Sequence, residues 1–327
     1  MRMGVLGTMV WDRIHARDVR SDPIEEWGGI AYALAGIAAA ADPTWTVVPL
    51  IKVGSDLEEE AFRFLRSLPG ADLDHGLAVV SEPNNRVELH YHDRARRTEC
   101  LTGGVPAWRW GELEPRLRGL DALYVNFISG FELDLETAAR LRMAYAGPIY
   151  ADLHSLLLGV GPDGLRQPRH LAAWREWLRC FDIVQLNEDE LGWLAGAWGD
   201  PWRLVAEAVG DELRLLLVTL GARGAAYVAS PGFRPQPLSW RESGLTSGRT
   251  LGTAGTARSG RVAVEDEVEE GDPTGCGDVW GATLFAALLR GQRLESAMIT
   301  ANRAASRNVR YHGATGLHDF LIGRIAR

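Results

Sequence analysis

The sequence predicts an α/β fold of three layers, in which a mostly parallel central sheet lies between two layers of helices and carries a small additional β-sheet. Two observations support this class. Between residues 121 and 224, short apolar strands alternate with segments of helical period, which is typical of a parallel sheet. Between residues 77 and 102, strand-like pieces follow one another without a helix. We therefore expect one domain over residues 1–327, with a lid of strands inserted at about 77–102 and a second candidate lid segment at 8–25.

The composition excludes several functional classes. The 327 residues are 46% hydrophobic and 24% charged, as in ordinary globular proteins, and a formal net charge of -8 argues against nucleic-acid binding. Three widely separated cysteines indicate neither a disulfide framework nor a metal pair, so we expect a cytoplasmic protein. The N-terminus has no signal-peptide pattern, and the most apolar run, Ile30–Ala41, is too short to span a membrane.

Two ligand positions are expected near the N-terminus. Met3–Leu6 is predicted to be a buried strand, which places Asp12 just past a strand end, where α/β sheets bind ligands. Gly28 and Gly29 open an apolar helix that continues to Ala40, so free N–H groups are expected at its start. A second strand and a second helix are predicted at residues 46–51 and 57–68.

The expected lid contains a strand of alternating character at residues 86–92. Its apolar side chains share one face, whereas Glu88, His90 and His92 share the other. Two histidines on one face could bind a metal, but no third ligand is evident nearby, so a solvated strand is the preferred interpretation. Lid strands have exposed edges, and pairing them across a two-fold axis would bury those edges. We therefore expect a homodimer through the lid.

From residue 121 the predicted elements alternate regularly. Strands are expected at 122–126, 149–153, 182–186 and 213–220, and helices at 135–145, 170–180, 188–198 and after residue 201. Asn187 would follow the third of these strands, and Gly221 and Gly224 would form the turn after the fourth. Residues 231–260 lack a sustained apolar period and are predicted to be a long, partly mobile loop.

The most informative stretch begins at Asp272 and reads D-P-T-G-C-G-D, followed by an apolar helix to Leu289. The backbone N–H groups of Gly275, Cys276 and Gly277 would lie at the start of this helix and form an anion site. Asp278 would stand beside the anion. Because a carboxylate does not bind phosphate, it is expected to accept a proton from a nucleophile that attacks phosphate. The sequence thus predicts phosphoryl transfer; the alternative is that Asp278 only caps the helix.

These motifs resemble those of the ribokinase or PfkB family of carbohydrate and nucleoside kinases. The stretch from Asp272 is similar to the family's signature D-T-x-G-A-G-D. Four further pieces follow the family's order: Gly7 with Asp12, the pair Gly28-Gly29, Asn187 with Glu190, and V-T-L-G-A-R-G from Val218. The resemblance covers nearly the whole chain. It implies a ribokinase-like fold and an ATP-binding, magnesium-requiring transferase with an alcohol group as acceptor.

The resemblance also implies a role for each matching residue. Asp278 would be the catalytic base, and Gly275, Cys276 and Gly277 the anion hole. Glu190 would hold Mg²⁺ through water, since magnesium usually keeps several water ligands. Nucleotide contacts are expected from Asn187, Thr219, Gly221, Gly224 and Asn302, substrate contacts from Asp12, Gly28 and Gly29, and a monovalent cation such as K⁺ at Asp272 and Thr274.

Three departures from the family pattern concern the substrate and the anion hole. Ala33 stands where the family often has an asparagine that contacts the sugar, and Leu153-His154-Ser155 follows Asp152 where many sugar kinases have D-x-N-x-R. Cys276 replaces the commoner alanine. We expect a sugar as the acceptor, with a nucleoside as the nearest alternative. From a different class, the chain could be a non-catalytic nucleotide- or sugar-binding regulator on the same scaffold.

Overall fold

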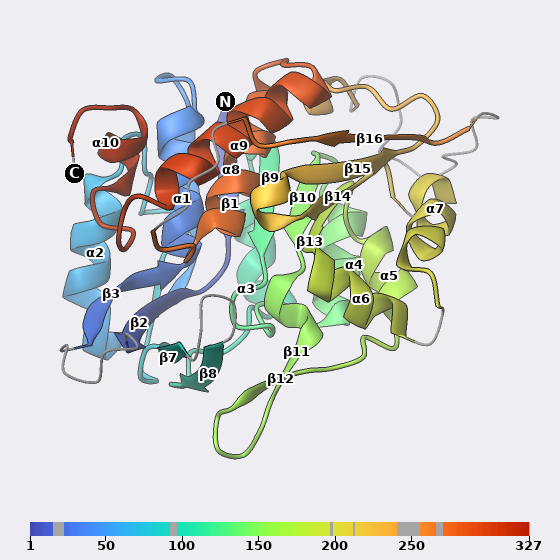
Figure 1. The fold of residues 1–327 in the computed structure, drawn as a ribbon. Helices are drawn as coiled ribbons and strands as arrows, with labels where there is room; N and C mark the ends of the chain where they lie inside the picture. The colour runs from blue at the N-terminus through green and yellow to red at the C-terminus, as the bar shows by residue number, and fades with distance from the viewer. Residues whose placement is uncertain are drawn as a thin grey trace.

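The structure is a computed structural model that describes residues 1–15, 23–91, 97–196, 199–211, 213–240, 256–265 and 271–326. An eight-stranded sheet crosses the molecule, helices cover both of its faces, and a smaller four-stranded sheet lies beside it (Figure 1). The predicted class, a three-layer α/β/α sandwich with a mostly parallel sheet, is confirmed.

The large sheet has the order β16-β15-β14-β13-β10-β9-β1-β4. Neighbours from β4 to β14 pair in parallel, whereas β15 and β16 are added antiparallel at one edge. The bounds are β1 (Arg2–Leu6), β4 (Thr46–Leu50), β9 (Ala122–Asn126), β10 (Ile149–Asp152), β13 (Ile183–Asn187), β14 (Leu215–Thr219), β15 (Ala225–Ala229) and β16 (Arg258–Val262).

Two hydrophobic clusters, one on each face, hold the layers together. Successive residues of β9 alternate between them: Tyr124 belongs to one cluster, and Leu123 and Val125 to the other. This is why buried parallel strands have nearly continuous apolar sequences. One layer contains α1 (Ile30–Ala40), α8 (Cys276–Leu289), α9 (Leu294–Asn308) and α10 (Leu317–Leu321); the other contains α4 (Leu135–Ala144), α5 (Trp174–Arg179), α6 (Glu188–Ala195) and α7 (Pro201–Asp211).

Helix α8 is the centre of its layer. It is buried without interruption from Val279 to Leu289, and it packs against both α1 and α9. A helix that is apolar on all sides is stable only when neighbours cover it completely. The N-terminus of α8 is consequently held in a fixed position against the sheet. Two further helices, α2 (Glu58–Ser67) and α3 (Trp110–Leu113), precede β9 in the chain.

The small sheet has the order β3-β2-β7-β8. Strands β2 and β3 pair antiparallel, as do β7 and β8, and β2 pairs with β7 in parallel. The predicted strand at 77–80 does not join this sheet, because β6 (Ala78–Val80) pairs instead with β5 (Lys52–Gly54). The bounds are β2 (Met9–His15), β3 (Ile24–Gly29), β7 (Arg86–Tyr91) and β8 (Arg97–Thr102).

Several elements differ from the predictions. Asp12 lies inside β2 and not past a strand end, because Val10, Asp12 and Ile14 alternate inward along that strand. Strand β15 was not expected, and neither was the hairpin of β11 (Leu158–Val160) and β12 (Arg166–Pro168). The predicted loop at 231–260 contains the buried Trp240 and part of β16, while residues 241–255 lie outside the described part of the chain.

Among the described residues, no helix combines the length and the apolar character that crossing a membrane requires.

Candidate active site

Three polar side chains form a row across adjacent strands, two of them at the carboxyl end of their strand. Asn126 at the end of β9 pairs in register with Asp152 at the end of β10, which pairs in turn with Gln185 of β13. All three are buried, and a buried polar group is costly unless it is hydrogen-bonded. Gln185 Nε2 donates to Asp152 Oδ2 (2.8 Å), and Tyr150 donates to Gln185 Oε1 (2.6 Å). We call Asn126, Asp152 and Gln185 the polar row.

The polar row receives the N-terminus of α8. Asn126 Nδ2 donates to Asp278 Oδ1 at 2.6 Å, and Gln185 Nε2 donates to the carbonyl of Gly277 at 3.1 Å. A side chain at Gly281 would overlap Gln185, so glycine at this position permits the close approach of helix and sheet. The predicted catalytic aspartate is therefore oriented by an asparagine that the sequence motifs did not single out.

Gly275 ends the turn that precedes α8. Its φ is 75°, in the left-handed region that favours glycine, and an added Cβ would overlap the ring of Tyr32. The N–H of Cys276 donates to the carbonyl of Pro273 (3.1 Å), and the N–H of Val279 donates to the carbonyl of Gly275 (2.9 Å), so the helical hydrogen bonds begin at this glycine. An anion at this helix start would meet the N–H groups of the first turn and would share that of Cys276 with the carbonyl of Pro273.

The thiol of Cys276 is not a nucleophile. Burial raises its pKa to about 11, with a further contribution from the negative charges of Asp272 and Asp278 and an opposing one from a hydrogen bond to Asn308. Sγ lies 3.3 Å from Asn308 Nδ2 and 3.5 Å from the carbonyl of Ala305. The side chain thus packs as a neutral group, and only the backbone of Cys276 is available to an anion.

Tyr32 in the first turn of α1 connects the two ends of the predicted site. It is 2% exposed, and its ring lies against Gly275. Burial, followed by the negative charges of Asp12, Asp272 and Asp278, raises the pKa of Tyr32 well above its usual value. The hydroxyl therefore stays protonated and can act as a hydrogen-bond donor. Tyr32 follows Gly29 by three residues and falls in the first turn of a predicted helix. The sequence could therefore have suggested Tyr32 as a site residue.

The predicted substrate residues lie together. Asp12 is buried and its carboxylate lies against the Cα of Gly28, since an added Cβ there would overlap it. Gly29 has a φ of 59°, and α1 begins at the next residue, Ile30, as expected from the sequence. An added Cβ at Gly29 would meet the carbonyl of Thr8 at 2.8 Å. Contacts thus require glycine at both positions, and the backbone conformation requires it at Gly29 as well.

Asn187 and Glu190 form a reciprocal capping box at the start of α6. Asn187 Oδ1 accepts from the backbone N–H of Glu190 (2.9 Å), and Glu190 Oε2 accepts from that of Asn187 (2.8 Å). Glu190 Oε1 also accepts from Asn187 Nδ2 (2.7 Å) and lies 3.1 Å from His154 Nδ1. The two residues therefore cap the helix, and any ligand of Glu190 must share oxygens that already accept hydrogen bonds.

His154 is a further site residue that the motifs did not predict. Its φ of 26° is the only positive value at a non-glycine residue in the described part of the chain, and strained backbone of this kind often occurs at functional sites. Burial lowers the pKa of His154, but the hydrogen bond to Glu190 and the charges of Glu190, Asp278 and Asp152 outweigh burial and raise it to about 9. His154 is therefore a cation at neutral pH.

The predicted nucleotide residues are divided between two places. Thr219 pairs in register with Asn187 at the strand ends, and Gly224 closes the turn into β15, where an added Cβ would overlap the carbonyl of Val262. Gly221 has open space around its Cα. Asn302 is buried elsewhere: its amide accepts from Trp280 (2.8 Å) and donates to the carbonyls of residues 262 and 263. These contacts give Asn302 a structural role.

The predicted cation residues form a compact turn. Asp272 Oδ1 accepts from both the backbone N–H (2.9 Å) and the hydroxyl (2.6 Å) of Thr274, and Asp272 Oδ2 lies 3.3 Å from His312 Nδ1. The carbonyl of Thr274 accepts from Asn308 Nδ2 (2.8 Å). Hydrogen bonds within the protein thus already involve the Asp272 and Thr274 oxygens that a monovalent ion would need.

A separate cavity of about 320 Å³ opens between β8 and the segment that follows β9. None of the predicted catalytic, nucleotide or substrate residues lines it. Its walls include Asn85, Leu101, Gly103, Ser129, Gly130 and Arg169.

Comparison with protein families gives one match. Residues 163–319 match the model described as pfkB family carbohydrate kinase. This range contains the polar-row residue Gln185, the capping box and the 272–278 turn, whereas Asp12 and the glycine pair precede it. No curated protein sequence matches the chain significantly.

Solved structures resemble the chain over its whole length. A pyrophosphate-dependent kinase in the ribokinase family, in a sulfate complex, aligns at a TM-score of 0.70 and 16% identity, covering 98% of this chain and 99% of its own. Ribokinase from Arabidopsis thaliana, complexed with ribose and ATP, gives 0.68 and 18%, covering 98% and 97%. A nucleoside kinase from Methanocaldococcus jannaschii gives 0.67 and 14%, covering 99% and 98%. The feature that this chain shares with these three structures is the fold.

Proposed function

We propose that the chain, whose residues 163–319 match the pfkB family carbohydrate kinase model and whose fold is ribokinase-like, transfers a phosphoryl group from ATP to a hydroxyl group of a small sugar-like substrate. The expected enzyme class, a phosphotransferase with an alcohol acceptor, agrees with the family that matches. The donor, the acceptor and the residue roles are our proposal.

The observation that supports this proposal most is the contact between Asn126 and Asp278. An amide N–H that donates to a carboxylate at 2.6 Å forms a charge-assisted hydrogen bond, which is stronger than one between neutral groups. The same contact fixes the orientation of the Asp278 side chain at the start of a buried helix. An acceptor hydroxyl beside Asp278 would then be aimed at a phosphoryl group held by the helix N-terminus.

The proposed mechanism depends on position more than on basicity. Phosphoryl transfer has a loose transition state in which negative charge lies on the equatorial oxygens. The N–H groups of the 275–277 turn, the predicted anion hole, would stabilise that charge, and the cationic His154 would add to their effect. Asp278 would take the hydroxyl proton as the new bond forms. An aspartate suffices as the base because the proton leaves late.

The site fits Mg²⁺ by the chemistry of its donors. Burial raises the pKa of Asp152 well above its ordinary value, and the negative charges of Glu190 and Asp278 raise it further. Three crowded carboxyl groups are hard oxygen donors of the kind that Mg²⁺ prefers. Because both oxygens of Glu190 already accept hydrogen bonds, we propose that Glu190 holds the ion through water. When bound, Mg²⁺ would neutralise charge on the donor phosphates.

ATP is the proposed donor, although two of the similar structures are of a pyrophosphate-dependent kinase. Two of the similar ribokinases are complexes with ATP or ADP, which supports ATP. In this chain, Thr219 and Gly221 lie beside the capping box and would border the nucleotide. Asn302 lines a small recess together with Ala263 and Ile299, and we keep it as a candidate near the adenosine. K⁺ at Asp272 and Thr274 stays a prediction, which potassium-independent turnover would remove.

The acceptor is proposed to lie between the small sheet and α1, beside Asp12, Gly28 and Gly29. Tyr32 would donate a hydrogen bond there. We propose the small sheet as a lid that excludes water, so that ATP is not simply hydrolysed. One of its edges is partly covered, because Leu101 of β8 donates to the carbonyl of Gly164. Strand β3 at the other edge would therefore be the one available to a second copy of the chain.

The experiment that tests this function measures product release from a panel of acceptors. Sugars, sugar phosphates, nucleosides and inositol are each supplied with ATP or with pyrophosphate, with and without Mg²⁺. We expect ADP to form with one class of acceptor, only with ATP and only with Mg²⁺. Phosphate transfer from pyrophosphate would correct the donor, and a nucleoside acceptor would correct the substrate class. Bound ATP without acceptor-dependent ADP would support the regulator alternative.

A further inference from the structure

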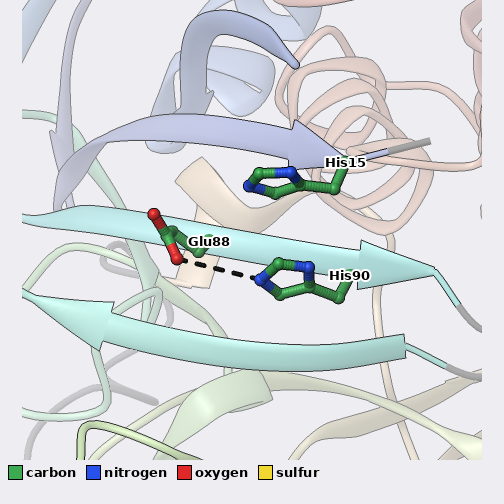
Figure 2. A group of neighbouring side chains, drawn as sticks. All are labelled: His15, Glu88 and His90. Atoms are coloured by element: carbon green, nitrogen blue, oxygen red, sulfur yellow. Dashed lines mark ion pairs between the residues drawn. The ribbon is translucent and has the colours of Figure 1, made fainter. Parts of the chain in front are cut away.

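Three potential metal ligands lie together on the outer face of the small sheet, away from the site described above. In the parallel pairing of β2 with β7, Arg13 is opposite Glu88 and His15 is opposite His90. Side chains alternate along a strand, so these four residues share one face while Val87 and Leu89 are buried on the other. Figure 2 shows His15, Glu88 and His90 gathered on neighbouring strands.

The sequence alone paired His90 with His92, which lies outside the described residues, and gave no third ligand. The register of two strands 75 residues apart supplies it. One ligand atom from each of His15, Glu88 and His90 lies within 4.8 Å of the other two, and His90 Nε2 is 3.7 Å from Glu88 Oε2. The imidazole rings are stacked, with centroids 4.3 Å apart and planes 13° from parallel.

One nitrogen in this cluster lacks an explanation within the protein. His15 Nε2 is shielded from solvent and has no hydrogen-bond partner in the described part of the chain. Buried polar atoms are normally satisfied, and one that is not calls for a ligand or a water. A metal ion is the natural partner of a neutral imidazole nitrogen that faces a second imidazole and a carboxylate.

We propose that His15, Glu88 and His90 form a zinc-binding site. Two imidazole nitrogens and one carboxylate oxygen are ligands that Zn²⁺ accepts at about 2.0–2.2 Å, with a fourth position left for water. Tetrahedral ligands at these bond lengths lie about 3.4 Å apart. Rotation of the side chains must therefore move the three ligand atoms closer together by on the order of 1 Å. The paired backbones of β2 and β7 need not move.

Arg13 lies beside the proposed zinc site and would repel the ion, but it does not occupy the metal position. Its Nη1 lies 3.8 Å from Glu88 Oε1, the carboxylate oxygen other than the one that faces His90. Oε2 is thus directed to the metal position while Oε1 faces the guanidinium. A fixed positive charge beside a dication lowers its affinity, so removing Arg13 should strengthen zinc binding.

Zinc would link β2 to β7 and stiffen the small sheet. Because β2 also carries Asp12 on its opposite face, the metal would stabilise the strand that presents this residue. The zinc site does not depend on the proposed kinase function, since it shares no residue with it. Either proposal can fail while the other stands.

The test titrates the metal-free full-length chain with Zn²⁺ alone in competition with a chromophoric zinc indicator. We expect one zinc ion per chain, an affinity at least about 10-fold weaker in His15→Ala and in His90→Ala, and a several-fold stronger affinity in Arg13→Gln. The matched control is His75→Ala, which removes an exposed histidine paired with the carboxylate of Asp72 and outside the proposed zinc site.

Two results would overturn the proposal. One is a wild-type chain that binds no zinc in competition with the indicator. The other is an affinity in His15→Ala and His90→Ala equal to that in the His75→Ala control. Melting temperatures of the metal-free variants show whether each is folded, and because both substitutions are on the sheet surface we expect these temperatures to match the wild type.

Discussion

Asn126 and Asp278 are 152 residues apart in the sequence, and a hydrogen bond of 2.6 Å joins them. Asn126 ends the strand β9 in the middle of the large sheet, and Asp278 stands in the first turn of the central helix α8. The contact therefore ties the proposed base to a buried residue on an interior strand of the large sheet. The sequence motif at 272–278 does not include Asn126, the residue that orients its aspartate.

Removal of this contact should slow turnover without preventing nucleotide binding. In Asn126→Ala the Asp278 carboxylate loses a charged hydrogen bond, which is worth about 1.5–3 kcal/mol, so we expect kcat to fall about 10- to 100-fold. The KM for ATP should change little, because Asn126 lies away from the proposed nucleotide residues. Steady-state kinetics measure both constants. An unchanged kcat in a folded variant would show that Asp278 does not need this orientation.

Gly275→Ala should destabilise the protein more than the left-handed backbone alone explains. Its added Cβ overlaps the ring of Tyr32, whereas Gly119 has the same φ of 75° and open space around it. Gly119→Ala is thus the matched control. We expect the control to cost about 1–2 kcal/mol, from backbone strain, and Gly275→Ala to cost about 3 kcal/mol or more. Urea unfolding of both variants gives the comparison, and equal losses would mean that Tyr32 moves aside freely.

The raised pKa of His154 predicts a loss of stability at alkaline pH. Its folded pKa of about 9 exceeds the unfolded value of 6.5, so its contribution is fully present below pH 6.5 and is lost as the pH rises through 9. The side chain is 29% exposed, which reduces the effect to about 1–3 kcal/mol.

His154→Gln keeps a donor but cannot carry the charge. Unfolding free energies of wild type and variant, measured between pH 6 and 10, should converge as the pH rises. Parallel profiles for the two proteins would show that His154 is not charged in the folded state.

The requirement for Mg²⁺ should depend on Glu190 and not on its neighbour. Glu190→Gln preserves the capping box but removes the negative charge, so we expect the Mg²⁺ concentration for half-maximal activity to rise about 10- to 100-fold. Glu188→Gln, in the same helical turn, removes an exposed carboxylate that pairs with Arg223 and serves as the control. Chelation of Mg²⁺ should stop turnover in all three proteins. If both variants needed the same Mg²⁺ as wild type, Glu190 would have only its capping role.

Much of the fold follows from local sequence. The strand at 122–126 and the start of α1 after Gly29 agree with the predictions, because buried parallel strands are apolar on both faces and glycines mark helix starts. Strand β2 falls in the candidate lid segment 8–25, but its bounds were not predicted, because Asp12, a carboxylate, occupies an inward position of its alternating pattern. Strand β15 was missed because two glycines were interpreted as a turn with no strand to follow.

The site residues, like the elements of the fold, include some that the sequence predicts and some that it does not. The turn from Asp272 to Asp278 is contiguous and could be interpreted from its own residues. Asn126, Gln185 and Tyr32 come from three separate elements, and only strand register and helix packing bring them to Asp278 or Gly275. The same holds for His15 and His90. Contacts between distant residues require the fold, so a single sequence cannot supply them.

The central claim is that Asp278 is the base of a phosphoryl transfer, and Asp278→Asn tests it most directly. Asparagine keeps the size of the side chain and can still accept from Asn126, so the fold should be preserved. We expect acceptor-dependent ADP formation to fall by about three orders of magnitude, with ATP affinity within a few-fold of wild type. Near-normal turnover in the folded Asp278→Asn protein would contradict the proposed mechanism.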